Sequence, residues 1–216
     1  MTTSGTTAWS LTAQEIIDTA LVENRIIGPG RSATSRESTE CLKRLNGILK
    51  SWRGAGHLVA QADVTVPAND PSGTLPDYIY EITAARLVVS ATYERELSRY
   101  GRTEYMSLPN KATSGEPVLF YAENQRESPA LYVWPVPTTQ STVRIDYTRM
   151  PETVTALTQT VDWPEEYNEV LFTNLAVRCA GIFGRQPNPE LIDRAGYLRR
   201  IMEDDERPES YYMEGV

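Results

Sequence analysis

The sequence predicts a mainly α-helical fold, namely a bundle of about five helices with an inserted three-stranded antiparallel β meander. Apolar residues recur at helical spacing over most of the chain, and capping motifs stand where these segments begin. Between residues 118 and 149 the apolar residues recur at every second position instead, which is typical of strands. A shift of 88 positions also overlays residues 76–101 on the segment from Pro164 to Gly184, which favours two similar helices packed as partners, with the β segment inserted between them.

Two amphipathic helices are predicted first, over residues 12–27 and 34–52. Each begins with a Thr-x-x-Glu capping box, in which the threonine hydroxyl and the glutamate carboxylate accept hydrogen bonds from backbone amides of the first turn. The second helix carries one continuous apolar stripe, formed by Cys41, Leu42, Leu45, Ile48, Leu49 and Trp52. Trp52 is therefore predicted to pack in the core, and the alternative is a surface anchor for a partner.

The segments that follow show a strand pattern and then a helix pattern. Residues 58–66 have a period of two and predict a strand, whereas residues 68–74 are rich in turn formers and predict a loop. Residues 76–101 are predicted to form the third helix, with Gly101 as its C-cap. The apolar positions of that helix are Ile79, Ile82, Leu87, Val88, Ala91 and Leu97.

The β excursion, residues 118–149, follows an irregular stretch over residues 102–117. Three strands are predicted in it, Val118–Glu123, Leu131–Trp134 and Thr142–Arg149. Short turns join the three strands in sequence, which predicts a meander.

Two last helices complete the predicted domain. One is expected to run from an N-cap at Asp162 to Gly184, and the other begins at Asn188. The prediction is a single domain with a flexible tail over residues 207–216. Its helical core comprises residues 11–56, 76–101 and 162–203.

Composition and charge exclude several classes of function. The 216 residues are 40% apolar and carry a formal net charge of −8. Residues 162–216 hold 12 acidic and 6 basic side chains, and the rest of the chain holds 17 and 15. Without a basic stripe, tight binding to DNA phosphates is not expected. No apolar run approaches a membrane span and no signal peptide is recognised, so we expect synthesis in a cytoplasm-like compartment and no membrane association.

Cysteine and histidine are too few for most catalytic or metal-binding motifs. His57 is the only histidine, so neither a Cys/His zinc site nor a catalytic triad can be assembled with ease. No P-loop, G-x-G-x-x-G or G-x-S-x-G motif occurs. Cys41 and Cys179 lie in apolar helical patterns and are predicted to be two buried thiols, with a disulfide as the alternative. We therefore expect no catalytic residue, no metal and no cofactor.

Tyrosine is the prevailing aromatic residue, with 12 Tyr against 3 Phe. Tyrosine suits a surface with one wet edge and is enriched at protein interfaces, so aromatic residues of the β excursion and the tail are candidates for contacts with a partner. An ordinary hairpin folded over the core is the alternative for the β excursion. The candidate interface residues are Tyr121, Tyr132, Trp134, Tyr147, Tyr211, Tyr212 and Met213.

Residues 40–56 resemble a stretch of bacteriophage head-to-tail adaptor proteins, which in short-tailed phages are called tail accessory factors or packaged-DNA stabilisation proteins. Glu40-Cys-Leu-Lys-Arg-Leu-Asn-Gly-Ile-Leu-Lys-Ser-Trp52, followed by Gly54 and Gly56, is similar to their L-N-x-(I/M)-L-x-x-W-x-x-x-G pattern. Leu75-Pro76 and the stretch Tyr147-Thr-Arg-Met-Pro151, ahead of a P-x-x-(Y/W) helix start at Pro164, are similar in kind. In order, these pieces cover most of residues 11–202.

The resemblance implies a structural connector without enzymatic activity, located in the virion. It implies a homo-oligomeric ring of twelve copies beneath the portal protein, with one face on the portal and the other on the next tail component. The ring would help to retain packaged DNA, and its lumen would pass the DNA at ejection without binding it specifically. An acidic or mixed lining suits this role, because a basic lining would hold the phosphates. In such families the C-terminal segment often reaches the portal, which here falls on residues 203–216.

Two other functions stay open. One is a scaffold or regulatory assembly module unrelated to phage. The other is a cell-wall glycosidase with paired carboxylates, for which Glu165, Glu166 and Glu169 are candidates. Such an enzyme needs two carboxyl groups roughly 5–9 Å apart across a cleft, whereas carboxylates in the first turn of a helix are favoured there by the helix dipole.

Overall fold

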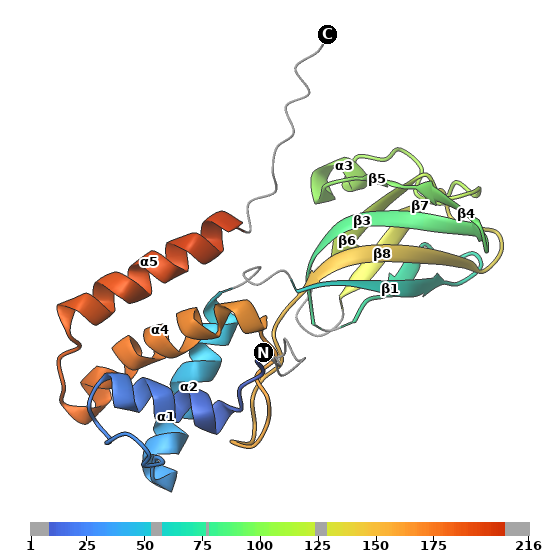
Figure 1. The fold of residues 1–216 in the computed structure, drawn as a ribbon. Coiled ribbons are helices and arrows are strands. Elements are labelled where there is room, and N and C mark those ends of the chain that lie inside the picture. The colour runs from blue at the N-terminus through green and yellow to red at the C-terminus, as the bar shows by residue number, and fades with distance from the viewer. Residues whose placement is uncertain (1–8, 53–57, 77, 124–128, 206–216) are drawn as a thin grey trace, which may run out of the picture. The chain divides into compact units, whose positions relative to one another are not determined.

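The structure, a computed structural model, describes residues 9–52, 58–76, 78–123 and 129–205. The chain divides into two compact units (Figure 1). Residues 1–58 and 151–216 form the helical unit, and residues 59–150 form the β unit. The single domain expected from the sequence stays a prediction, which one calorimetric unfolding transition would test. The expected flexible tail and His57 lie outside the described residues.

The helical unit is built around a central helix, α4. Its elements are α1 (Ala13–Glu23), α2 (Ser35–Ser51), η1 (Glu165–Tyr167), α4 (Asn168–Ala180), η2 (Gly181–Phe183) and α5 (Pro189–Asp205), where η denotes a short 3-10 helix. α4 packs against α1, α2 and α5, and most of its side chains are buried. The fully buried core side chains include Ile16, Ile17, Leu21, Leu45, Ile48, Leu49, Leu171 and Leu175.

Both predicted capping boxes are confirmed at the starts of α1 and α2. α1 ends at Glu23 rather than at residue 27, because Arg25 adopts a left-handed conformation with a φ of 54°. The N-cap predicted at Asp162 is wrong, since α4 begins only after η1. The Asp162 carboxylate instead accepts a hydrogen bond of 2.9 Å from the backbone N–H of Glu152.

The capping boxes give the stability of the protein a pH dependence. Hydrogen bonds from the backbone and the hydroxyl of Thr12 and of Thr34 hold the pKa of Glu15 and of Glu37 below the usual value. A lowered folded pKa contributes stability that is present above the unfolded pKa of about 4.3 and is lost as the pH falls through the folded pKa.

We therefore expect the melting temperature to fall on acidification below about pH 4.3, and to fall less in the double variant Glu15→Gln/Glu37→Gln. Glutamine retains the capping geometry but does not titrate, so the variant separates the charge from the hydrogen bond. Thermal unfolding followed by circular dichroism over a pH series measures the effect. An equally steep acid dependence in both proteins would contradict this assignment.

The β unit contains two four-stranded sheets and one short helix, α3 (Arg102–Met106). One sheet has the order β1-β8-β3-β4 and is antiparallel throughout; the other has the order β2-β7-β6-β5, with β5 parallel to β6. Side chains of both sheets, among them Val143, Ile145, Phe120 and Leu131, share one buried core. The strands are β1 (Val59–Val66), β2 (Ser72–Thr74), β3 (Ile79–Ser90), β4 (Tyr93–Glu96), β5 (Ser98–Arg99), β6 (Leu119–Glu123), β7 (Ala130–Trp134) and β8 (Ser141–Arg149).

The predicted mainly α fold class is wrong, because residues 76–101 form β3, β4 and β5 rather than a third helix. β3 has register shifts against β8 between Ile79 and Glu81 and between Ile82 and Ala84. Each such bulge places an extra residue in β3, so its buried positions, Ile79, Ile82 and Ala85, are three residues apart. That spacing imitates a helix. The overlay of residues 76–101 on residues 164–184 therefore pairs strands with a helix.

The predicted three-stranded meander is also wrong, although its three strands are present as β6, β7 and β8. β6 and β7 are neighbours, but β8 lies in the other sheet, between β1 and β3. The strand predicted over residues 58–66 is confirmed as β1. The expected loop over residues 68–74 includes β2, and the expected irregular stretch over residues 102–117 includes α3.

Gly73 of β2 marks a close approach between the two sheets. A Cβ atom at this position would lie 2.6 Å from Cγ1 of Val64 and 3.0 Å from the carbonyl oxygen of Thr65. We expect Gly73→Ala to lower the free energy of unfolding by about 1–3 kcal/mol, because the backbone must move to admit the methyl group. Urea unfolding measures the change.

The matched control is Gly47→Ala in α2, where a Cβ meets no atom within 4 Å. There alanine should stabilise the helix by roughly 0.5–1 kcal/mol. Equal effects of the two substitutions would contradict the close packing at Gly73.

Candidate functional site

Three of the candidate interface residues lie together on one face of the sheet β2-β7-β6-β5. Tyr121 of β6 stands opposite Tyr132 of β7, with their ring centroids 6.0 Å apart, and Tyr105 of α3 stacks on Tyr121 at 5.3 Å. The indole N–H of Trp134 donates a hydrogen bond of 2.9 Å to the carbonyl oxygen of Asn110. These contacts define an aromatic cluster that holds the segment around α3 against the sheet.

The aromatic cluster is partly core and partly surface. Tyr105 and Tyr121 are buried, with 5% and 6% of their surface exposed, whereas Tyr132 and Trp134 are half-buried. Burial raises the pKa of Tyr105, and the Lys111 ammonium group lies 5.8 Å from the centroid of its ring. The cluster offers aromatic edges and one cation to a partner. That combination suits apolar and cation–π contacts.

Tyr147 is not brought to this cluster. It lies on β8 of the other sheet, is buried, and contacts Tyr78 with ring centroids 6.2 Å apart. Burial and a hydrogen bond with Tyr78 raise the pKa of Tyr147 to about 12. Tyr211, Tyr212 and Met213 lie outside the described residues. A role in binding a partner stays a prediction for all of these residues.

The sheet β1-β8-β3-β4 carries a network of ion pairs on the face that points away from its core. Arg144 contacts Asp63 at 2.8 Å and Glu94 at 2.5 Å, and Arg86 contacts Asp146 at 2.6 Å. The guanidinium of Arg144 lowers the pKa of Asp63. Such cross-strand pairs favour the observed register and leave this face polar.

Two residues of the adaptor-like stretch have structural roles in the helical unit. The side-chain amide of Asn46 donates to the carbonyl oxygen of Val154 and accepts from its N–H, both at 2.9 Å. The predicted core position of Trp52 is confirmed, since 4% of its surface is exposed. Its ring lies 5.9 Å from that of Trp163, and the guanidinium of Arg199 lies 5.8 Å from its centroid.

The two cysteines are buried, and two of the three helix-start glutamates, Glu165 and Glu169, are engaged in contacts within the helical unit. Cys41 and Cys179 are confirmed as buried free thiols, and their mutual hydrogen bond together with burial raises the pKa of Cys41. Glu165 accepts a hydrogen bond of 2.7 Å from the backbone N–H of Trp9, and Glu169 pairs with Arg194. Within the described ranges, no group of three or more His, Cys, Asp or Glu side chains is placed to hold a metal ion.

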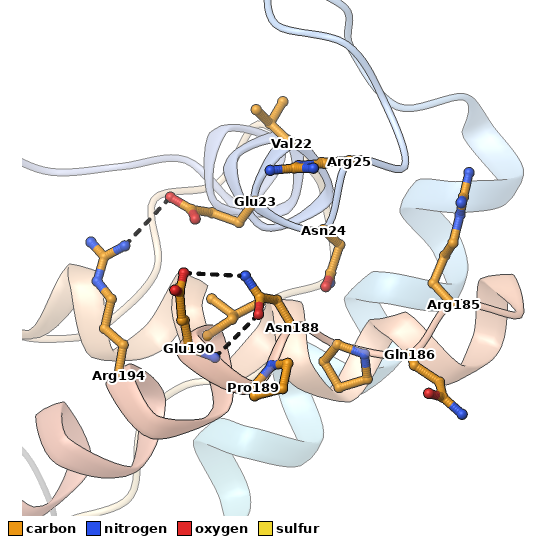
Figure 2. Close-up of a pocket in the computed structure, with 12 residues that line it drawn as sticks. Val22, Glu23, Asn24, Arg25, Arg185, Gln186, Asn188, Pro189, Glu190 and Arg194 are labelled. Carbon is orange, nitrogen blue, oxygen red and sulfur yellow. Dashed lines mark hydrogen bonds and ion pairs between the residues drawn. The ribbon is translucent and has the colours of Figure 1, made fainter.

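A groove that the sequence did not indicate lies in the helical unit, where the end of α1 faces the connection from η2 to α5 (Figure 2). Its volume is about 820 Å³. Its lining includes Arg25 and Arg185, after which we name it the Arg25–Arg185 groove. Amide side chains of Asn24, Gln186 and Asn188, the rings of Pro187 and Pro189, and the side chains of Val22, Glu23, Glu190, Leu191 and Arg194 complete it.

The charges in this groove are unequally paired. Arg194 pairs with Glu169 and lies 3.8 Å from Glu23. Arg25 and Arg185 are exposed, and neither has a carboxylate within 4 Å in the part of the chain that the structure describes. Two guanidinium groups with no carboxylate partner among the described residues therefore line one groove.

Both arginines stand at helix C-termini that close with the same motif. After α1, the N–H of Arg25 donates to Val22 (2.8 Å) and the N–H of Ile26 to Leu21 (2.9 Å). After η2, the N–H of Arg185 donates to Ala180 at 3.0 Å. These are Schellman motifs, whose left-handed position favours glycine. That position is Gly184 in the second motif but Arg25 in the first.

We expect Arg25→Gly to raise the free energy of unfolding by about 1 kcal/mol, because glycine adopts the left-handed conformation without the steric cost of a Cβ. Urea unfolding of the variant beside Arg31→Gly provides the comparison. Arg31 is exposed and is not one of the residues with a φ above zero, so glycine should give no gain there. A loss of stability in Arg25→Gly would show that the arginine side chain itself stabilises the fold.

The only sequence signal for the groove was the run after Gly184, in which Arg185 and the two prolines of Pro187-Asn-Pro189 follow a helix end. The other wall comes from Arg25, about 160 residues earlier, and no pattern in the chain links the two. No helix among the described residues is both long and apolar enough to span a membrane.

Comparison with known proteins gives one family. A family model described as SU10 adaptor protein matches residues 4–212, which is nearly the whole chain. The match confirms the resemblance to phage head-to-tail adaptors seen in residues 40–56 and around Pro151. A search of curated proteins found no match.

Proposed function

Because the chain belongs to the SU10 adaptor protein family, we propose that it forms a ring beneath the portal of a phage virion and joins the portal to the tail. The ring, of twelve copies, helps to retain packaged DNA and passes it at ejection without specific binding. The protein is made in the host cytoplasm and acts in the assembled particle. The observation that carries the proposal is a family match that spans both units of the chain. Family membership implies a structural rather than a catalytic protein, and favours this role over a scaffold unrelated to phage.

The charge of the chain supports passage of DNA without retention on the wall. The formal net charge is −8, and acidic side chains outnumber basic ones in both parts of the chain. In the ion-pair network on the sheet β1-β8-β3-β4, Arg86 and Arg144 are paired with carboxylates, so neither guanidinium group is available to bind a DNA phosphate. A lumen lined by such surfaces repels the DNA backbone and lets it slide.

The aromatic cluster supports a role in contacts with a partner. Half-buried Tyr132 and Trp134 present amphipathic edges on a surface whose inner part, Tyr105 and Tyr121, is already packed. Such edges lose little conformational entropy when a partner covers them. We propose that they form part of the contact with the portal or the next tail component.

The test is assembly on the portal protein encoded by the same phage genome. The purified chain and portal are mixed at micromolar concentration, and light scattering and negative-stain electron microscopy measure the complex. A stoichiometric ring on the portal is expected, and its mass gives the copy number. The portal of an unrelated phage is the control. Free chain beside free portal in the matched mixture would contradict the proposal.

A further inference from the structure

We propose that the Arg25–Arg185 groove binds residues 206–214 from the C-terminal segment of a second copy of this chain. The inference rests on the proposed function and deepens it, since it names a contact between neighbouring subunits of the ring. The groove is built from described residues of one unit, and the occupant is a segment of the same sequence.

Charge complementarity is the first argument. Three arginines and two glutamates, Glu23 and Glu190, line the groove, so its formal charge is about +1. Arg25 and Arg185 have no carboxylate within 4 Å among the residues that the structure places, whereas Arg194 pairs with Glu169 and lies 3.8 Å from Glu23. Residues 206–214 carry three carboxylates, Glu206, Glu209 and Glu214, against one arginine. Guanidinium groups bind carboxylates with two parallel hydrogen bonds, so the unpaired pair of arginines favours an acidic peptide.

The apolar and amide side chains of the groove fit the uncharged side chains and the backbone of residues 206–214. Pro187, Pro189 and Val22 give the groove an apolar part, which suits Tyr211, Tyr212 and Met213. The amide of Gln186 can bind the peptide backbone, whereas that of Asn188 already bonds to Glu190 (Figure 2). The two prolines restrict the loop that carries Gln186, so less entropy is lost when the groove is filled.

The conformation of Arg25 is an independent argument. Its left-handed backbone costs a residue with a Cβ about 1–2 kcal/mol, and the equivalent position after η2 is a glycine. An arginine at a position that favours glycine points to a use for its side chain. In the folded subunit that side chain lines the groove (Figure 2), and it has no carboxylate within 4 Å among the described residues.

The length of α5 favours a segment from a second copy over the subunit's own segment as the occupant of the groove. The groove includes the first residues of α5, whereas residues 206–214 follow the last residue of that helix. Seventeen residues separate these ends, or about 25 Å of helix at 1.5 Å per residue. A segment that folded back at about 3.3 Å per residue would use about seven residues before it reached the groove. Glu206 and Glu209 would then stay outside, whereas a neighbouring copy brings all three carboxylates.

A contact of this kind joins two different surfaces, the groove of one copy and the C-terminal segment of the next. It is therefore heterologous, the type of contact from which a ring forms when the rotation between successive copies closes.

The experiment compares self-association of full-length chains by sedimentation velocity over a wide range of concentration and salt. The groove variant is Arg25→Asn/Arg185→Gln, since asparagine tolerates the left-handed conformation. The segment variant is Glu206→Gln/Glu209→Gln/Glu214→Gln. The matched control is Arg31→Gln/Arg200→Gln, which removes two exposed arginines that line no part of the groove and have no ion pair among the residues described.

We expect the wild type to associate, more weakly at high salt, and each variant to associate about tenfold or more weakly, with the control unchanged. An equimolar mixture of the groove and segment variants should form dimers and nothing larger, because only one intact groove and one intact segment can meet. A wild type that stays monomeric, or a groove variant that associates as the wild type does, would overturn the inference. The inference would also be overturned if the mixture associated no more than the two variants do separately, because the segment of one copy would then not bind the groove of another.

The portal assay separates this inference from the proposed function. If the groove variant assembles on the portal as fully as the wild type and self-association is unaffected, the inference fails and the adaptor role stands. If wild-type chains associate through the groove but never bind the portal, the adaptor role fails and the contact between copies stands.

Discussion

Replacing Leu171 with alanine is expected to lower the free energy of unfolding by about 3–4 kcal/mol. Leu171 is fully buried in α4, the helix that contacts α1, α2 and α5. The substitution therefore leaves a cavity at the helix against which the three others pack. A small domain has a total stability of only about 5–15 kcal/mol. Urea unfolding followed by far-ultraviolet circular dichroism measures the loss.

The control for this substitution is Ile192→Ala in α5, whose side chain is 46% exposed. Its effect should stay within about 0.5–1 kcal/mol, because little apolar surface leaves the core. If Leu171→Ala cost no more than this control, the central position of α4 would be incorrect.

Replacing Tyr121 with alanine is expected to cost about 3 kcal/mol or more. The substitution removes the ring that stacks on both Tyr105 and Tyr132, and so weakens the packing of the segment around α3 on the sheet. Tyr121→Phe retains the ring and should stay within about 1 kcal/mol of the wild type. Thermal and urea unfolding of both variants measure the difference.

The same pair of variants decides between a structural and a partner-binding role for Tyr121. If Tyr121→Ala unfolded as the wild type does but failed to assemble on the portal, Tyr121 would contact the portal directly. If both variants assembled and Tyr121→Ala was the less stable, the ring would serve the fold, and the contact with a partner would fall to Tyr132 and Trp134.

The helical unit could be predicted well because its signals are local. The Thr-x-x-Glu pairs at Thr12 and Thr34 lie within one turn of the helices that they cap, and the stripe from Cys41 to Trp52 has a single period. The start of α4 was misplaced because Asp162 binds the distant backbone N–H of Glu152 instead of a helix end. A residue suited to a cap does not reveal which backbone amide it will meet.

The β unit could not be predicted to the same extent because its pattern depends on pairing. The bulges of β3 exist only against β8, and without that partner Ile79, Ile82 and Ala85 have a spacing typical of a helix. β8 has the alternation of a strand, but nothing in it specifies the sheet that it joins. Strand existence is thus local information, and strand order is not.

The candidate site was only partly predictable, because the alternation within a strand can be read from the sequence whereas the pairing of distant segments cannot. Tyr121 and Tyr132 alternate with core residues on adjacent strands, so their meeting follows from the predicted hairpin. Tyr147 was grouped with them by composition, and its assignment to the other sheet separates it. The Arg25–Arg185 groove joins two helix ends far apart in the sequence, which only the packing of α1 on α4 brings together.

The β unit is inserted between the two sequence segments of the helical unit, and this determines which unit can fold first during translation. Residues 59–150 leave the ribosome as one uninterrupted stretch, whereas α1 and α2 have no α4 to cover their apolar faces until about 120 residues later. At roughly 5–20 residues per second, that delay is on the order of ten seconds. During translation the β unit can therefore fold first. Until α4 is synthesised, the apolar faces of α1 and α2 stay exposed and accessible to chaperones or to other nascent chains.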